Sequence, residues 1–99
     1  MRTRQPPAIA VALVLLAGAG VAARAQQDAA ALQARQYQQA LHEMDTRGDC
    51  LAAIPLFNRA AEGPDRQLSA RSLLYIGVCF ETLGRDGADA TYRRLLDRY

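Results

Sequence analysis

A helical pattern that occurs twice along the chain constrains its fold more than any other feature. Turn glycines, small residues and large apolar or aromatic residues recur 35 or 36 residues apart. The matching pairs are Tyr37 and Leu73, Gly48 and Gly84, Ala53 and Ala88, and Phe57 and Tyr92. A period of this length is typical of proteins that stack copies of one helix–turn–helix unit, because each copy buries its apolar face on a neighbour. We therefore expect a short array of helical hairpins.

Apolar residues at helical spacing predict four helices, over residues 31–47, 50–62, 67–83 and 86–99. Gly48 and Gly84 are expected to end helices in the left-handed conformation, and Asp49 is expected to cap the helix that follows it. Pro55 should bend the second helix, because it removes a hydrogen bond within it. The residues Gly63-Pro64-Asp65 form the clearest break. No segment shows a β-strand pattern, so the predicted fold class is all-α.

The first 25 residues are predicted to be a signal peptide for export. Arg2 and Arg4 provide a basic start, and residues 8–23 form an apolar run of 16 residues, shorter than the roughly 20 that a spanning helix needs. The triplet Ala23-Arg24-Ala25 provides a small-x-small cleavage site, so the cut is expected after Ala25. An uncleaved membrane anchor is the alternative. Residues 26–33 are interpreted as a polar lead-in to the first helix.

Removal of the signal peptide changes the charge of the chain. The full sequence carries a formal net charge of +2, but the part after residue 25 has 9 arginines against 10 acidic residues, a net charge of −1. No basic stripe and no interleaving of arginine with aromatic residues remains after the cut. A protein that binds nucleic acid needs such a positive footprint. Nucleic acid is therefore not expected among the partners.

The residues of the two units resemble the tetratricopeptide repeat family of exported bacterial proteins. The second unit matches the family's pattern of large apolar, small, aromatic and turn positions, and the first unit follows it except at Leu41, where the family has a small residue. The matching residues of the second unit are Leu73, Ile76, Gly77, Phe80, Gly84, Ala88, Tyr92 and Leu95. Those of the first unit are Tyr37, Ala40, Met44, Gly48, Ala53, Phe57 and Ala60. The resemblance implies tandem hairpins over residues 34–65 and 66–99, a short α-solenoid.

The resemblance also implies where a partner would bind, since ligands of the family lie against the face built by the first helix of each hairpin. Carried over by position, these residues are Arg35, Gln38, His42, Asp45, Arg71, Leu74, Val78 and Glu81. A surface of mixed charged and apolar residues suits an extended or helical peptide. The alternative is that Leu74 and Val78 merely pack against the first hairpin.

Two cysteines, Cys50 and Cys79, remain after the signal peptide, and export would place them in an oxidising compartment. In the geometry that the resemblance implies, both lie toward the same edge of the stack, which makes a disulfide one interpretation. Cys79 packing as a small buried hydrophobe is the other. A thiol oxidoreductase is a remote third class, because its Cys-x-x-Cys motif is absent.

The sequence offers no set of residues that an enzyme would need. His42 is the one histidine, which we interpret as a solvated surface residue, and no phosphate-binding loop or nucleophile motif is present. We expect no catalytic residues, metal or cofactor. We predict that the protein is a scaffold that binds another protein. It is expected to be periplasmic or secreted, and not to insert into a membrane after cleavage. Two repeats rarely suffice alone, so self-association or further repeats are also expected. The alternative is the N-terminal docking module of a longer exported protein, for example one that continues into a β-propeller.

Overall fold

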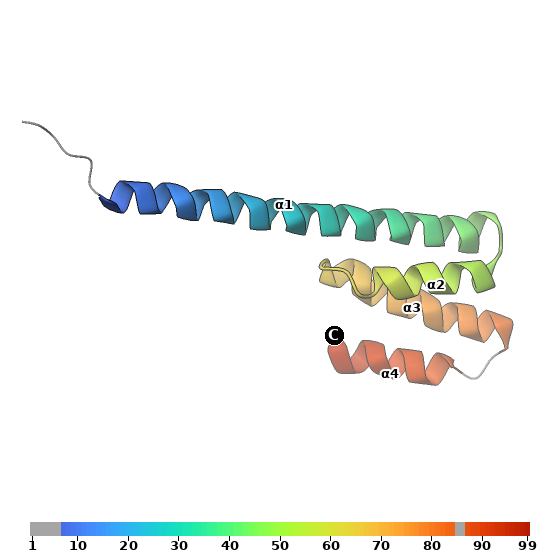
Figure 1. The fold of residues 1–99 in the computed structure, drawn as a ribbon. Coiled ribbons are helices and arrows are strands. Elements are labelled where there is room, and N and C mark those ends of the chain that lie inside the picture. The colour runs from blue at the N-terminus through green and yellow to red at the C-terminus, as the bar shows by residue number, and fades with distance from the viewer. Residues whose placement is uncertain (1–6, 85–86) are drawn as a thin grey trace, which may run out of the picture.

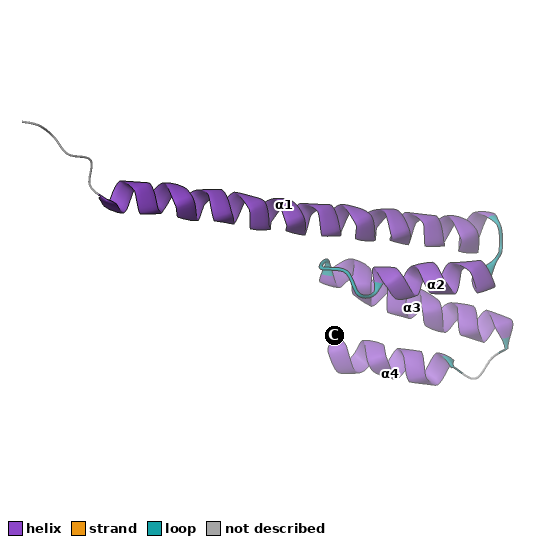
Figure 2. Cartoon of the chain, in the orientation of Figure 1, coloured by secondary structure: helices purple, strands orange, loops and turns teal. Residues whose placement is uncertain are grey.

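The computed structural model describes residues 7–84 and 87–99, with only the helical backbone given for residues 7–19. Within these ranges every regular element is a helix, as the sequence predicts (Figure 2). The elements are α1 (Pro7–Leu41), a π-helical turn η1 (His42–Thr46), α2 (Cys50–Ala60), α3 (Arg66–Leu83) and α4 (Ala88–Arg98). The predicted basic start at Arg2 and Arg4 and the predicted onset of the last helix at Asp86 lie outside the described residues.

The helices pack in the order of the chain, with α2 on α1, α3 on α2 and α4 on α3, and α1 also contacts α3. The chain reverses direction at each connection, so that α1 and α3 run the same way (Figure 1). The N-terminal part of α1 extends well beyond the other three helices (Figure 1). The bundle therefore consists of the C-terminal part of α1 together with α2, α3 and α4.

The first helix differs from its predicted bounds at both ends. It begins at Pro7 and not near residue 31, so residues 26–33 lie inside α1 and are not a separate lead-in. Alanine, leucine and glutamine dominate this stretch and no proline interrupts it after Pro7, so nothing in the sequence breaks the helix. At its other end α1 stops at Leu41, because residues 42–46 adopt the wider π-helical turn. No helix within residues 7–84 and 87–99 combines the length and the hydropathy that crossing a membrane requires.

The predicted helix ends within the two hairpins are confirmed. Gly48 and Gly84 have φ angles of 63° and 66°, the left-handed region that glycine adopts without a steric penalty. The Asp49 carboxylate caps α2 by accepting a hydrogen bond from the Ala52 amide at 3.0 Å. Asp65 caps α3 in the same way, accepting from the amides of Gln67 and Leu68 at 2.9 and 3.2 Å. Pro55 lies inside α2 with an exposed side chain.

The core lies between the bundle part of α1 and the facing sides of α2 and α3. Its fully buried large residues include Phe57, Leu73 and Ile76, all of which the predicted stripes contain. The rings of Tyr37 and Tyr75 pack on Phe57, with centroids 5.9 and 5.5 Å from it. Aromatic contacts at this spacing add to the stabilisation that burial provides. The aromatic cluster thus joins α1, α2 and α3 at one point.

Candidate partner-binding surface

The eight residues predicted to bind a partner are distributed over one side of α1, η1 and α3, and we call them the α1–α3 surface. Arg35 and Gln38 lie on α1, His42 and Asp45 lie on η1, and Arg71, Leu74, Val78 and Glu81 lie on α3. All eight are exposed. The residues of α3 follow those of α1 and η1 at a constant offset of 36 positions. Since α1 and α3 run in the same direction and touch, each pair is expected to lie at a similar height along the two helices.

The two halves of the surface meet where the aromatic rings of α1 and α3 approach each other. The centroids of Tyr37 and Tyr75 lie 6.4 Å apart. Burial raises the pKa of the Tyr37 phenol and Tyr75 adds to this shift, whereas the positive charge of Arg71 opposes it. The aromatic pair thus joins α1 and α3 beside Arg71 of the surface.

Leu74 and Val78 are the apolar part of the surface and lie one helical turn apart on α3. They are 43% and 36% exposed, so each side chain is partly packed against the bundle and partly accessible. Single exposed apolar side chains are common on any protein, and only a larger contiguous apolar patch marks a binding site by itself. Leu74 and Val78 therefore remain partly accessible on the α1–α3 surface.

Glu81 stands apart from the other residues of α3, because it faces the last helix. Burial raises the pKa of the Tyr92 phenol on α4, and the negative charge of Glu81 raises it further. The ring of Tyr92 covers Gly77, one turn earlier on α3. Glu81 thus lies at the edge of the α1–α3 surface, toward α4.

His42 and Asp45 are presented by the π-helical turn, which the sequence did not predict. The Arg47 amide donates to the His42 carbonyl at 3.1 Å and the Asp49 amide to the Glu43 carbonyl at 2.7 Å, so the last turn is wider than an α-helix allows. Arg47 also pairs with the Glu43 carboxylate at 3.5 Å. Such turns recur at functional sites. Here the turn places two polar side chains of the predicted surface at the end of α1.

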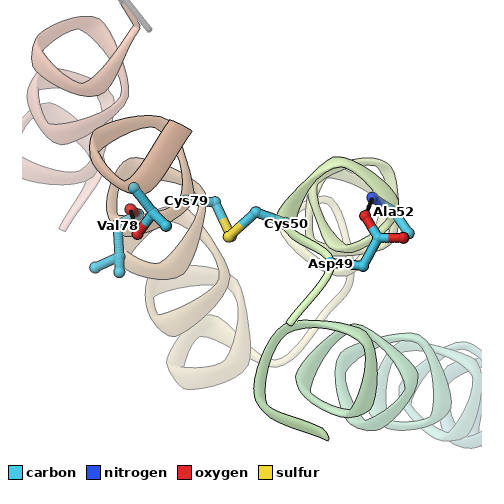
Figure 3. Close-up of a disulfide and its surroundings, with 6 residues drawn as sticks. Asp49, Cys50, Ala52, Val78 and Cys79 are labelled. Atoms are coloured by element: carbon cyan, nitrogen blue, oxygen red, sulfur yellow. Dashed lines mark hydrogen bonds between the residues drawn. A yellow bond between two sulfur atoms is a disulfide. The ribbon is translucent and has the colours of Figure 1, made fainter. Parts of the chain in front are cut away.

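Cys50 and Cys79 are joined as a disulfide between α2 and α3 (Figure 3). Their Cα atoms lie 5.3 Å apart, within the range that a disulfide spans. Cys50 opens α2 next to its cap Asp49, and Cys79 follows the exposed Val78 on α3 (Figure 3). Both cysteines are buried. The bond attaches the part of α3 that carries Val78 to the N-terminal end of α2.

Gln33 is the structurally important residue that the sequence analysis missed. Its carboxamide is 1% exposed and forms a polar junction between α1 and the turn that joins α2 to α3. The Nε2 group donates to the carbonyls of Ala60 and Asp65 and to the Ser69 hydroxyl at 2.8, 3.1 and 3.0 Å, and the Asp65 amide donates to Oε1 at 2.7 Å. One signal was available, because Gln33 precedes Tyr37 and Ala40 on the same helical stripe.

A hollow of about 260 Å³ lies beside this junction, away from the α1–α3 surface. It is lined by Ala29, Leu32, Gln33, Gln36, Arg59, Glu62, Gly63 and Pro64, none of which belongs to the predicted binding residues. Among the described residues, no group of three or more histidine, cysteine, aspartate or glutamate side chains is arranged to hold a metal ion. The α1–α3 surface is therefore the feature on which we base the functional argument.

Comparisons of the chain with protein-family models, with curated proteins and with solved structures give no match.

Proposed function

We propose that the chain is a non-enzymatic scaffold of the tetratricopeptide repeat type, which is exported to the periplasm or cell envelope and binds another protein through the α1–α3 surface. The observation that carries the proposal is the exposed pair Leu74 and Val78 on α3, flanked by Arg71 and by polar residues of α1 and η1. An apolar pair of this kind would anchor a peptide, and the polar residues around it would orient the peptide and give specificity.

The repeat type is supported by how the helices of each hairpin approach one another. Gly77 on α3 lies beneath the ring of Tyr92 on α4, where a Cβ atom would collide with the ring. In the first hairpin, the fully buried Ala53 and Phe57 stand at the positions that correspond to Ala88 and Tyr92. A small residue facing an aromatic ring lets two helices pack closely. The second hairpin thus has the close helix contact that the repeat pattern calls for, whereas the first hairpin carries Leu41 at the position that corresponds to Gly77.

Export is supported by the sequence of residues 1–25 and by the exposure of the predicted cleavage site. Residues 20–29 are all exposed, in the part of α1 that extends beyond the bundle (Figure 1). A cut after Ala25 would leave the buried Gln33 and everything that follows it in place. Export would thus remove residues 1–25 and retain the helical bundle.

A second candidate function is a docking module, and the face of α4 favours it. Ala60 and Ala61 of α2 are buried with 0% and 4% exposure, in a helix that α3 covers. At the matching positions of α4, Leu95 is half-buried and Leu96 is 77% exposed. In this proposal α4 would dock another helical segment of a longer exported protein, for example one that continues into a β-propeller.

Site-specific photo-crosslinking separates the two functions. A photoreactive amino acid is placed at Leu74 or at Leu96 in the exported chain, with Leu51 as a control because it is 55% exposed and belongs to neither surface. The scaffold proposal predicts one discrete crosslinked protein from position 74 that is absent from positions 96 and 51. A discrete product from position 96 alone would favour the docking module. The absence of any discrete product from position 74 would contradict the scaffold proposal.

A further inference from the structure

The new N-terminus that export would create lies in an exposed and unsupported part of α1. Residues 20–29 are exposed, Val21 is 70% exposed, and a Cβ atom built on Gly20 would meet no atom within 4 Å. From residue 20 onward, Ala30 is the first half-buried residue of α1 and Gln33 the first buried one. A chain that begins at Gln26 would therefore start with about one exposed helical turn before it reaches the bundle.

The chemistry of this N-terminus is unusual because the sequence contains no lysine. The α-amine of Gln26 would be the single primary amine within residues 26–99. As an ammonium group it would sit at the positive end of the helix dipole, where a cation is unfavourable, whereas Asp28 in the same first turn is favourable there. Loss of the amine charge would therefore stabilise the start of α1.

We infer that Gln26 of the exported chain is converted to pyroglutamate, an inference that rests on the proposed export and cleavage after Ala25. The α-amino nitrogen attacks Cδ of its own side-chain carboxamide, and a five-membered lactam forms. The bond between Cδ and Nε2 breaks, and the nitrogen leaves as ammonia with a proton from the attacking amine. No atom is oxidised or reduced, and no other reactant is needed.

The local structure suits the ring that this reaction forms. The lactam ring contains the backbone nitrogen, Cα, Cβ, Cγ and Cδ, the same five atoms as the ring of proline. Proline is favoured at the first position of a helix, because its fixed φ angle is already helical there. The carboxamide of Gln26 is exposed, whereas the carboxamide of Gln33 is buried and held by hydrogen bonds. Cyclisation at residue 26 thus disturbs no contact of the bundle.

The test uses the full chain with its leader, expressed in a Gram-negative host and purified from the periplasm. Intact mass and N-terminal peptide sequencing by mass spectrometry are recorded on the fresh protein and after incubation at neutral pH. We expect an N-terminal peptide that starts at residue 26 and is lighter than the uncyclised peptide by the mass of one ammonia. We also expect loss of labelling by an amine-reactive reagent, since no lysine contributes a background.

The Gln26→Asn variant is the matched control, because a side chain shorter by one methylene cannot close the five-membered ring by this route. It is expected to be cut at the same bond, to keep its full mass and to be labelled at one amine. A wild-type peptide that starts at residue 26 with its amine intact after incubation would overturn the inference and leave export standing. A peptide that starts at another residue would overturn both the inference and the proposed cleavage site.

Discussion

At the scale of single residues, two close contacts explain how the helices are held at their observed separation. Gly63 lies against the side chain of Gln33, and Gly77 lies against the ring of Tyr92, and in both places a Cβ atom would collide with the neighbour. Neither glycine has a positive φ angle. Glycine is required at both positions by the close approach of another element and not by the conformation of its backbone.

Replacing Gln33 by alanine tests the polar junction. The change leaves the Asp65 amide without its partner, whereas the Ala60 carbonyl keeps the Gly63 amide at 3.2 Å, so we expect the free energy of unfolding in urea to fall by about 1 to 3 kcal/mol. The Gln38→Ala variant, which changes an exposed glutamine on the same helix, should stay within about 0.5 kcal/mol of the wild type. Equal effects of the two substitutions would show that the junction contributes nothing.

Replacing Gly77 by alanine tests the contact with Tyr92. Helix propensity alone predicts stabilisation by about 0.5 to 1 kcal/mol, whereas collision with the ring predicts a net loss of about 1 to 3 kcal/mol. We expect the loss, measured by urea unfolding. In a Tyr92→Leu background, which removes the ring, the same glycine substitution should cost less or become stabilising. Stabilisation by Gly77→Ala in the wild-type background would contradict the observed packing.

Single residues also show which contacts the sequence could predict. The sequence predicts the helix ends at Gly48 and Gly84 and the cap at Asp49, because these roles depend on neighbours within a few residues along the chain. Gln33 was missed because its partners lie 27 to 36 residues away, at positions that no local pattern connects. The position of Gln33 on an apolar stripe indicated a buried polar side chain, but it did not indicate which groups that side chain binds.

At the scale of elements, α1 and the disulfide also separate what local sequence predicts from what depends on how the helices pack. The stripe of Tyr37 and Ala40 predicted a helix, and it is present, but its start at Pro7, a residue favoured at the first helical position, was missed, and no local signal indicated the π-helical turn at its end. The four helices and their apolar faces follow from spacing. The geometry of Cys50 and Cys79 depends on how α2 and α3 pack, so the sequence left two interpretations open.

The disulfide is expected to contribute substantially to the stability of the pair α2 and α3. It closes a loop with a sequence separation of 29 residues. A bond across such a loop lowers the entropy of the unfolded chain, which stabilises the folded state by about 3 to 4 kcal/mol. We expect the Cys50→Ala/Cys79→Ala variant to lose about this much in urea unfolding. Its stability should not change when a reductant is added, whereas that of the wild type should fall. A wild-type protein that is indifferent to reductant would show that no bond forms.

At the scale of the whole molecule, the proposed scaffold depends on a bundle that keeps its shape without the leader. Aromatic, disulfide and polar contacts join α1, α2 and α3. Helix α4 packs mainly on α3, through Tyr92, the buried Thr91 and the half-buried Leu95, and surface pairs add to this contact. Arg94 and Arg98 approach the Glu62 carboxylate at 3.8 and 3.9 Å, and the Arg66 guanidinium lies 4.9 Å from the centroid of the Tyr99 ring. Exposed pairs of this kind add little stability each, so α4 is expected to be the least stable helix of the bundle.

The measurement that tests this account most directly is thermal unfolding of residues 26–99, followed by far-ultraviolet circular dichroism with and without reductant. The account predicts a strongly helical protein that unfolds in one cooperative transition, at a temperature that falls when the disulfide is reduced. A weakly helical chain that loses its signal gradually under both conditions would contradict it. In that case residues 26–99 would not form a bundle able to present the α1–α3 surface.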